Sequence, residues 1–265
     1  SLGVLRHAIN QTLRQERMQE VFDEARKIQM SILPRRTPVY GGFELYGRIQ
    51  PMESVGGDFY DYIPITDKIL GLAIADVSGH GLPAALQVRD IYMGLRMGMA
   101  RDFKIVRTVE RLNQIIHKST LTSRFVSMFY GELEPNGVFI YVNAGHPAPF
   151  HLSATGEVRN LDEGGPVLGP LAEATYERGF IRLNPGDMVV LYTDGMIEAT
   201  PAESDGGEEF GIERLVEIAR RLRGKSSKEI AETMMKAVET YRGDAEPQDD
   251  RTVVVVTYPK LQAGA

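Results

Sequence analysis

Residues 55–63 read VGGDFYDYI, and residues 69–81 read ILGLAIADVSGHG. Both are strand-like apolar segments, and the residues between them, PITDK, are typical of a tight turn. A hairpin whose turn is centred on Asp67 places Asp58 directly opposite Asp76. Directly paired residues of an antiparallel ladder have Cβ atoms about 5 Å apart. Two carboxylates at that distance repel each other unless protons or a cation neutralise them, so the pair is a first indication of a divalent metal.

The same pattern returns later in the chain. Residues 188–195 read MVVLYTDG, an apolar strand that ends on Asp194 before a glycine. Residues 249–257 read DDRTVVVVT, and their continuous apolar run predicts a strand buried on both faces. The start of one antiparallel strand and the end of its neighbour lie at the same sheet edge, so four carboxylates are expected to converge. The four are Asp58, Asp76, Asp194 and Asp249.

Oxygen ligands without histidine or cysteine suit Mg²⁺ or Mn²⁺ in octahedral geometry, completed by water. Two such ions that share a carboxylate would activate a bridging water and clamp a phosphoryl group. An Asp-Gly pair at a strand end is also a common turn signal, and the hairpin register is what favours the metal interpretation. The roles of two residues are not decided by the sequence. Asp250 is either a ligand or a hydrogen-bond acceptor behind the ligands. His80 is either a general acid or a residue that holds the glycine turn in place.

Composition limits the class of protein. The chain has 265 residues, 43% of them hydrophobic and 25% charged, which is ordinary for a globular protein with a sizeable core. A net charge of −6 argues against nucleic acid or an anionic membrane as the main partner. Without cysteine there is neither a disulfide nor a thiolate metal site. No apolar run is long enough to insert into a membrane, and we expect a cytoplasmic protein.

Residues 2–33 lack proline and are rich in Gln, Glu, Arg and Leu, which predicts one long helix. Its apolar residues follow two short heptad frames that shift near Gln15. Either the helix docks on its own domain, or it is a connector that dimerises or transmits a signal. Because the sequence begins at Ser1 in this helix, we expect a fragment of a longer protein.

The rest of the chain alternates predicted strands and helices without a domain-splitting linker. We expect an α+β fold with antiparallel hairpins, an N-terminal helical connector at 1–33 and a second domain at 34–260. Helices are predicted at about 84–100, 104–119, 211–223 and 227–242, and a strand at 176–183.

Five motifs in order now resemble one family. They are VGGDFYD at 55–61, ADVSGHG at 75–81, NAGHP at 143–147, YTDG at 192–195 and DDRT at 249–252. Together they resemble the SpoIIE/RsbU branch of the PPM (type 2C-like) protein phosphatases, over about residues 25–258. The resemblance implies a four-layer αββα sandwich of two mainly antiparallel sheets flanked by helices, with 34–260 as the phosphatase domain.

The resemblance also implies roles for single residues. A binuclear Mn²⁺ or Mg²⁺ centre would have Asp76 as the bridge and the Val77 carbonyl on one ion. Asp194 and Asp249 would hold the other ion, while Asp58 orders metal-bound water. The residues expected next to these ligands are Gly57, Gly195, Asp250 and His80.

The implied reaction is hydrolysis of phosphoserine or phosphothreonine on a protein by metal-activated water. Members of this branch typically act on a STAS-type anti-sigma-factor antagonist, and many carry a sensor joined through a helix like 2–33, which gives a possible homodimer contact. The alternative is a regulatory binding module of the same fold, with little activity until a sensor or partner switches it on. No arginine clearly matches the phosphate-binding arginine of the eukaryotic enzymes, so phosphate binding is expected to rest mostly on the metals.

Overall fold

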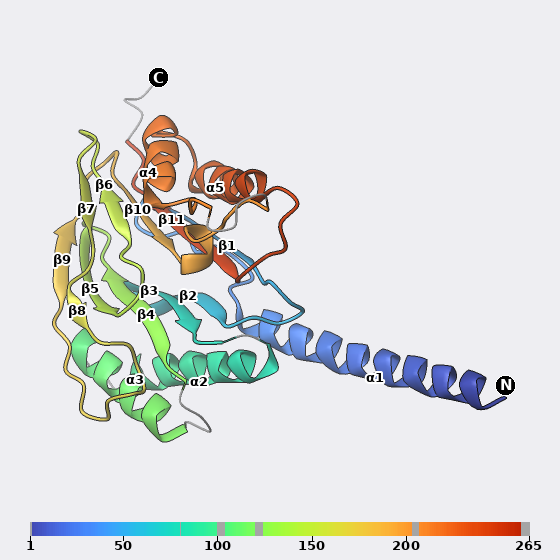
Figure 1. Cartoon of the computed structure of the whole chain (residues 1–265). Coiled ribbons are helices and arrows are strands. Elements are labelled where there is room, and N and C mark those ends of the chain that lie inside the picture. Colours follow the sequence, from blue (N-terminus) through green and yellow to red (C-terminus); the bar gives the residue numbers. More distant parts are fainter. Residues whose placement is uncertain (1, 80, 100–103, 120–123, 203–206, 261–265) are drawn as a thin grey trace.

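The computed structural model describes residues 2–79, 81–99, 104–119, 124–202 and 207–260. Two β-sheets stack face to face, and helices cover the outer face of each (Figure 1). This arrangement confirms the expected αββα sandwich with an N-terminal helical extension. Within the described residues, no helix is both long enough and apolar enough to cross a membrane.

The first sheet is antiparallel throughout and has α4 and α5 on its outer side. Its strands, in spatial order, are β1 (Glu44–Gln50), β11 (Arg251–Thr257), β10 (Met188–Tyr192), β6 (Phe150–Leu152) and β7 (Val158–Asn160). The helices are α4 (Ile212–Arg221) and α5 (Ser227–Arg242). Ser226 caps α5, since its hydroxyl oxygen accepts a hydrogen bond from the Glu229 backbone N–H at 3.2 Å.

The second sheet carries α2 and α3 on its outer side. Its strands are β2 (Asp58–Thr66), β3 (Ile69–Val77), β4 (Val126–Leu133), β5 (Val138–Ala144) and β8 (Gly164–Gly165), with β9 (Gly179–Arg182) also paired to β5. The helices are α2 (Leu82–Met99) and α3 (Ile105–Ser119). The β5–β8 pair is parallel, whereas the other ladders of this sheet are antiparallel.

The predicted hairpin register is confirmed, because Asp58 of β2 pairs directly with Asp76 of β3. The strands run further than expected, and the register shifts between Pro64 and Thr66. This irregularity takes up one residue and shortens the turn to Asp67 and Lys68. The bulge lies at the far end of the hairpin, so the pairing of the two carboxylates is unaffected.

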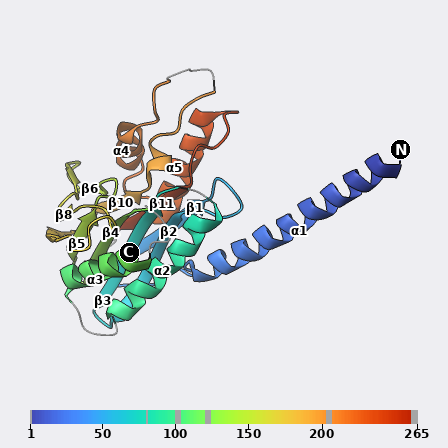
Figure 2. The ribbon, with the colours of Figure 1, turned by 60° about the horizontal axis from the view of Figure 1, so that its bottom comes forward.

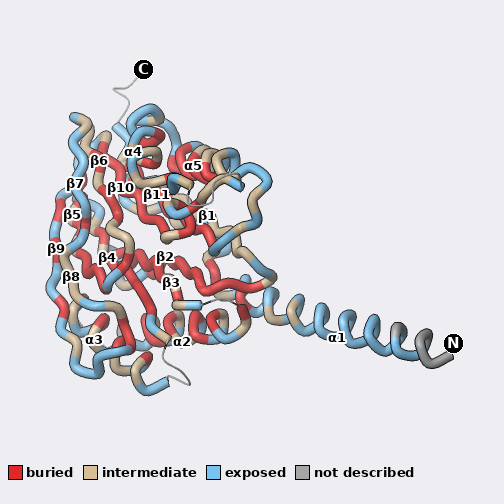
Figure 3. Tube along the Cα trace, viewed as in Figure 1, coloured by how far each residue is buried: buried red, intermediate tan, exposed pale blue. Residues whose placement is uncertain are grey.

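The continuous apolar run of β11 is buried on both faces of the strand. Val254 and Val256 belong to the core between the two sheets, whereas Val253 and Val255 pack under α4 and α5. Alternate residues of a strand face opposite sides, and here both sides are apolar. Figure 3 shows buried residues along the central strands of both sheets. The sandwich therefore has one core between its sheets and another beneath α4 and α5.

Helix α1 (Leu2–Ile32) projects away from this body as a long rod (Figures 1 and 2). Its C-terminal end packs on the body of the domain, where Gln29 and the following Leu33 are buried. Met18, Val21 and Ile28 of the predicted stripe remain more than half exposed. Most of the stripe therefore finds no partner among the described residues of its own chain.

Two predicted elements differ from the structure. The strand expected at 176–183 is limited to β9, because Tyr176 lies in a loop and turns its ring into the core. After β10 the chain enters a short 3₁₀ helix, η1 (Asp194–Met196), where the sequence suggested a simple turn. This helix turns the backbone directly after the carboxylate of Asp194.

Candidate metal centre

Asp58 joins the two sheets at one end of the sandwich. Its side chain is 1% exposed, and its Oδ2 accepts hydrogen bonds from Thr193 Oγ1 at 2.7 Å and from Thr252 Oγ1 at 2.5 Å. Both threonines belong to the opposite sheet region, at the end of β10 and in β11. Burial raises the pKa of Asp58 well above its usual value, and Asp76 and Asp250 add to this, while the hydroxyls oppose it.

Asp76 faces the other carboxylates across the same edge. Burial, followed by repulsion from Asp194, Asp249, Asp250 and Glu198, raises the pKa of Asp76 to about 8. Burial, Asp249 and Glu198 raise the pKa of Asp194 to about 6. Among the described residues, no cationic side chain contributes to either shift. The centre thus gathers negative charge from both sheets, which a divalent cation would neutralise.

The structure separates Asp249 from Asp250, which the sequence could not. Asp250 is buried, and its oxygens accept hydrogen bonds from the backbone N–H groups of Met52 at 2.7 Å and Gly57 at 2.6 Å. Asp249 is exposed and lines a small cavity with Asp76 and Val77. This geometry supports Asp249 as the ligand and Asp250 as the acceptor that holds the loop before β2.

Glycine is required at the close approaches around these carboxylates. A Cβ atom on Gly57 would lie 2.7 Å from the Val77 carbonyl oxygen and 3.4 Å from Asp76 Oδ1. A Cβ atom on Gly195 would lie 2.0 Å from the Asp250 carbonyl oxygen. Gly57 therefore leaves room for the Val77 carbonyl and the Asp76 carboxylate, whereas Gly195 lets η1 approach the backbone at Asp250.

Gln29 at the end of α1 also reaches this region. Its amide donates to the Gly56 carbonyl at 2.5 Å and accepts from the Gly56 N–H at 3.1 Å. Gly56 is next to Gly57, whose N–H binds Asp250. The loop before β2 is consequently held from one side by α1 and from the other by the start of β11.

The donor set fits a divalent cation of the Mg²⁺ or Mn²⁺ type. In the described parts of the chain, no three His, Cys, Asp or Glu side chains are placed to ligate one ion together. The oxygen donors at this edge are carboxylates and the Val77 carbonyl, and water would complete the coordination. Mg²⁺ is usually bound in this way, through one or two carboxylates and retained water.

The two histidines of the motifs have different outcomes. His80 lies outside the described residues, so its general-acid role stays a prediction. His146 is buried, with Nδ1 2.9 Å from Ser127 Oγ and Nε2 3.1 Å from the Tyr192 carbonyl oxygen. Burial lowers the pKa of His146 to about 3, so the ring is neutral and supports the turn between the sheets.

Sequence reasoning missed Thr193, Thr252, Gln29 and Glu198. Both threonines lie inside the quoted motifs, directly beside aspartates, which is the signal that could have marked them. Their common partner Asp58 could not be read from the sequence, because it depends on how the two sheets pack. Gln29 gave no signal, since a polar residue on a mostly exposed helix is ordinary.

Solved structures share this fold. The PP2C domain of SiaA from Pseudomonas aeruginosa aligns with a TM-score of 0.81 at 21% identity, covering 91% of this chain and 97% of that one. The phosphatase domain of SpoIIE from Bacillus subtilis, with a fragment of its regulatory domain, aligns with a TM-score of 0.69 at 18% identity, covering 83% and 64%. The chain therefore has the fold of the PP2C domains.

Residues 66–259 match the family model of Stage II sporulation protein E (SpoIIE), and the chain belongs to that family. Among curated proteins it is 28% identical over 212 residues to the phosphoserine phosphatase RsbU of Bacillus subtilis, covering 78% of this chain and 63% of RsbU. It is 29% identical over 229 residues to the protein IcfG of Synechocystis, covering 74% of this chain and 35% of IcfG. The chain thus spans about one third to two thirds of these relatives.

The raised pKa of Asp76 predicts a metal-sensitive pH dependence of stability. An aspartate whose folded pKa exceeds its unfolded value, about 3.9, binds more protons in the folded state, so stability falls as pH rises toward the folded pKa. With chelator present, we expect the free energy of unfolding to fall between pH 6 and 8, by up to ~1.4 kcal/mol per pH unit. Denaturant titrations at several pH values measure this.

In the same titrations Mn²⁺ should raise stability and flatten the slope. Asp76→Asn should remove the Asp76 part of the slope without metal and abolish most of the gain from Mn²⁺. An unchanged slope in Asp76→Asn would contradict the assigned repulsion.

Thr252→Val tests the bond between the sheets. The variant keeps the side-chain shape but removes one donor to the buried Asp58, which should lower the free energy of unfolding by about 1–3 kcal/mol. Thr252→Ser retains the hydroxyl and is the matched control, with a smaller loss expected. Equal losses in the two variants would mean that the methyl group, rather than the hydrogen bond, stabilises this position.

Proposed function

We propose that the chain is a metal-dependent protein serine/threonine phosphatase that hydrolyses phosphoserine or phosphothreonine on a regulatory protein. The observation that carries the proposal is the placement of Asp76, Asp194 and Asp249 at one edge of the sandwich, where Asp76, Val77 and Asp249 line one cavity. A scaffold without metal chemistry has no need for such a cluster. The proposed cofactors are two divalent cations, Mn²⁺ or Mg²⁺.

The proposed ligands are the side chains of Asp76, Asp194 and Asp249 and the carbonyl of Val77. When bound, such ions supply an activated water and neutralise the phosphoryl oxygens. Asp76 belongs to β3 of one sheet and interacts with Asp194 and Asp249 beside strands of the other, which suits a shared ligand. Asp58 accepts both threonine hydroxyls on Oδ2, so its Oδ1 is the atom proposed to order water.

The substrate class is supported by the named relatives. RsbU and RsbP of Bacillus subtilis are both phosphoserine phosphatases, at 28% and 24% identity. For this chain we propose a phosphorylated STAS-type anti-sigma-factor antagonist as substrate, acted on in the cytoplasm by a phosphatase domain at 34–260. The acidic chain is not expected to bind nucleic acid.

The phosphatase proposal predicts Mn²⁺-dependent hydrolysis of a small phosphate ester and of a phosphoserine protein. Asp76→Ala and Asp194→Asn should each lower kcat/KM by at least about a hundredfold, since each removes a ligand that positions the reacting groups. Chelator should abolish turnover in the parent chain. Circular dichroism of each variant checks that the fold is retained.

Turnover that survives both substitutions would rule out the proposed metal mechanism. A folded parent chain that binds Mn²⁺ yet hydrolyses neither substrate would favour the alternative, a regulatory module that needs a sensor or partner to become active.

We further propose that residues 1–33 are a connector that forms a homodimer through the exposed stripe of α1. The stripe is apolar at Met18, Val21 and Ile28, all more than half exposed. A second copy of the helix would bury these side chains in coiled-coil fashion. Through Gln29, the same helix holds Gly56 beside the carboxylate centre, so movement of α1 would shift the backbone at that centre.

The connector proposal predicts two separate roles of α1, namely dimer formation by its exposed stripe and support of Gly56 by Gln29. Deletion of residues 1–24 should reduce the mass in solution from dimer to monomer, measured by light scattering, while the Gln29 contact is kept. Gln29→Ala should keep the mass but lower the free energy of unfolding by about 1–3 kcal/mol, because buried Gly56 loses its partner. Gln19→Ala, which removes an exposed bond to Asp23, is the matched control. An unchanged mass after deletion would reduce α1 to a helix without a dimer role.

A further inference from the structure

Arg251 is a buried guanidinium that forms no ion pair with a described residue of the chain. It is the first residue of β11, it is 3% exposed, and its Nη1 atom has no hydrogen-bond partner within the described residues. Arg242, at the end of α5, is partly buried, and its Nε atom likewise lacks a partner there. Leaving a buried charge unpaired is strongly unfavourable, so this pair calls for an anion.

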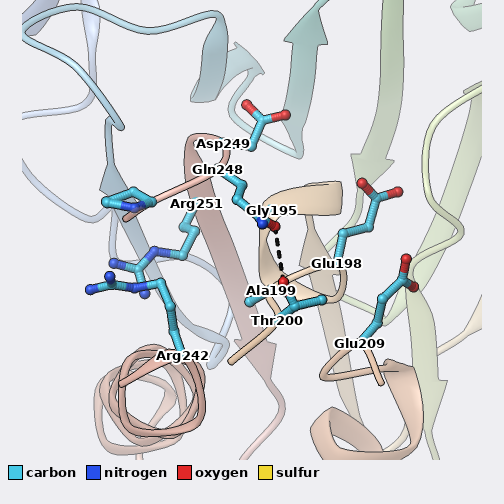
Figure 4. Close-up of a pocket in the computed structure, with 10 residues that line it drawn as sticks. Gly195, Glu198, Ala199, Thr200, Glu209, Arg242, Gln248, Asp249 and Arg251 are labelled. Atoms are coloured by element: carbon cyan, nitrogen blue, oxygen red, sulfur yellow. Dashed lines mark hydrogen bonds between the residues drawn. The ribbon is translucent and has the colours of Figure 1, made fainter. Parts of the chain in front are cut away.

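The two guanidinium groups lie together, and the acid that acts on Arg251 is Glu239 of α5, which forms no ion pair with it. Figure 4 shows Arg242 and Arg251 side by side, with the carboxylates of Asp249, Glu198 and Glu209 pointing elsewhere. Neither arginine forms an ion pair with a described residue of the chain. Two adjacent guanidiniums with free N–H groups can bind the oxygens of a phosphate or a carboxylate in bidentate fashion.

The arginines line the same cavity as the edge of the metal centre. This cavity has a volume of about 250 Å³ and also reaches Gly195, Gln248 and Asp249. It is large enough for one acidic side chain or one phosphate group. An extended chain bound with its phosphorylated residue at the carboxylate centre would place a neighbouring residue here.

We propose that Arg242 and Arg251 form an oxyanion site that takes an acidic side chain of the protein substrate next to the phosphorylated residue. The assignment of a substrate residue rests on the proposed phosphatase function, whereas the oxyanion site itself does not. The site would select substrates with acidic residues near the phosphoserine. It would compensate the negative charge that the carboxylates of Asp249, Glu198 and Glu209 present to an acidic substrate.

The binding test uses inorganic phosphate as the probe, with the full chain in chelator at constant ionic strength. Without metal, the carboxylate centre repels phosphate, so stabilisation reports the arginines. Phosphate should raise the Tm of the parent chain by several degrees relative to chloride. Arg251→Gln and Arg242→Gln should each lose most of this rise, while Arg221→Gln, which removes the same charge from the exposed face of α4, should retain it.

The Tm of Arg251→Met without phosphate distinguishes an unpaired charge from a packing role, because loss of a packing role would lower the Tm. Removing an unpaired buried charge should leave the Tm equal or higher when no phosphate is present. A lower Tm in Arg251→Met, together with no effect of phosphate on the parent chain, would overturn the site. Phosphate stabilisation that persists in Arg251→Gln would overturn it as well.

The substrate test compares a phosphoserine peptide flanked by Asp and Glu with its Asn and Gln counterpart. Arg251→Gln should raise the KM for the acidic peptide about tenfold more than the KM for the neutral one, the size of one lost charged hydrogen bond. An equal rise for both peptides would overturn the selectivity. If neither peptide is hydrolysed while phosphate still stabilises the parent chain, the phosphatase proposal fails and the oxyanion site remains.

Discussion

The bond between Asp58 and two threonine hydroxyls is the interaction on which the rest of this structure depends. A carboxylate taken wholly out of water is unfavourable unless hydrogen bonds stabilise it, and here both donors, Thr193 and Thr252, come from the opposite sheet. Thr193 Oγ1 also accepts the Thr252 N–H at 3.0 Å, which ties the end of β10 to the start of β11. The sheets are therefore fixed in relation to each other at the edge where the carboxylates gather. Elsewhere in the sandwich, the sheets are joined mainly by apolar packing, together with a few hydrogen bonds such as that from the Tyr60 hydroxyl to the Gly47 carbonyl at 3.1 Å.

Asp250 extends this organisation to the loop before β2. It accepts N–H groups of Met52 and Gly57, and Gln29 holds the intervening Gly56 from the α1 side. Segments far apart in the sequence thus determine one loop, which sets where Gly57 lies against Val77. The Gly57 carbonyl also accepts the Val77 N–H at 3.1 Å, so a shift of α1 that moves this loop would alter the approach of Gly57 to Val77. These hydrogen bonds are the physical link by which the proposed connector α1 would act on the carboxylate centre.

The sequence predicted what depends on local pattern. The register of Asp58 against Asp76 followed from one short turn and two apolar runs, and the two-sided burial of β11 followed from its unbroken valines. The sequence could not separate Asp249 from Asp250, because adjacent aspartates at a strand start differ only in which face they take. It also could not show the partners of Asp58, since these depend on the packing of two sheets. The strand predicted at 176–183 was too long because Tyr176 is buried from a loop, which an apolar pattern cannot distinguish from a strand.

The charges at the start of β11 show how one strand can supply residues to two different environments. Side chains alternate between the two faces of a strand, so Asp250 and Thr252 turn toward Asp58 and the opposite sheet, while Arg251 turns toward the helices with Val253. From the sequence alone, an arginine that follows two aspartates would be expected to pair with them. The alternation prevents this, and it places the guanidinium beside Arg242 of α5 instead. A carboxylate edge and a pair of arginines therefore lie within one cavity without neutralising each other, and each is left to bind a group of the opposite charge.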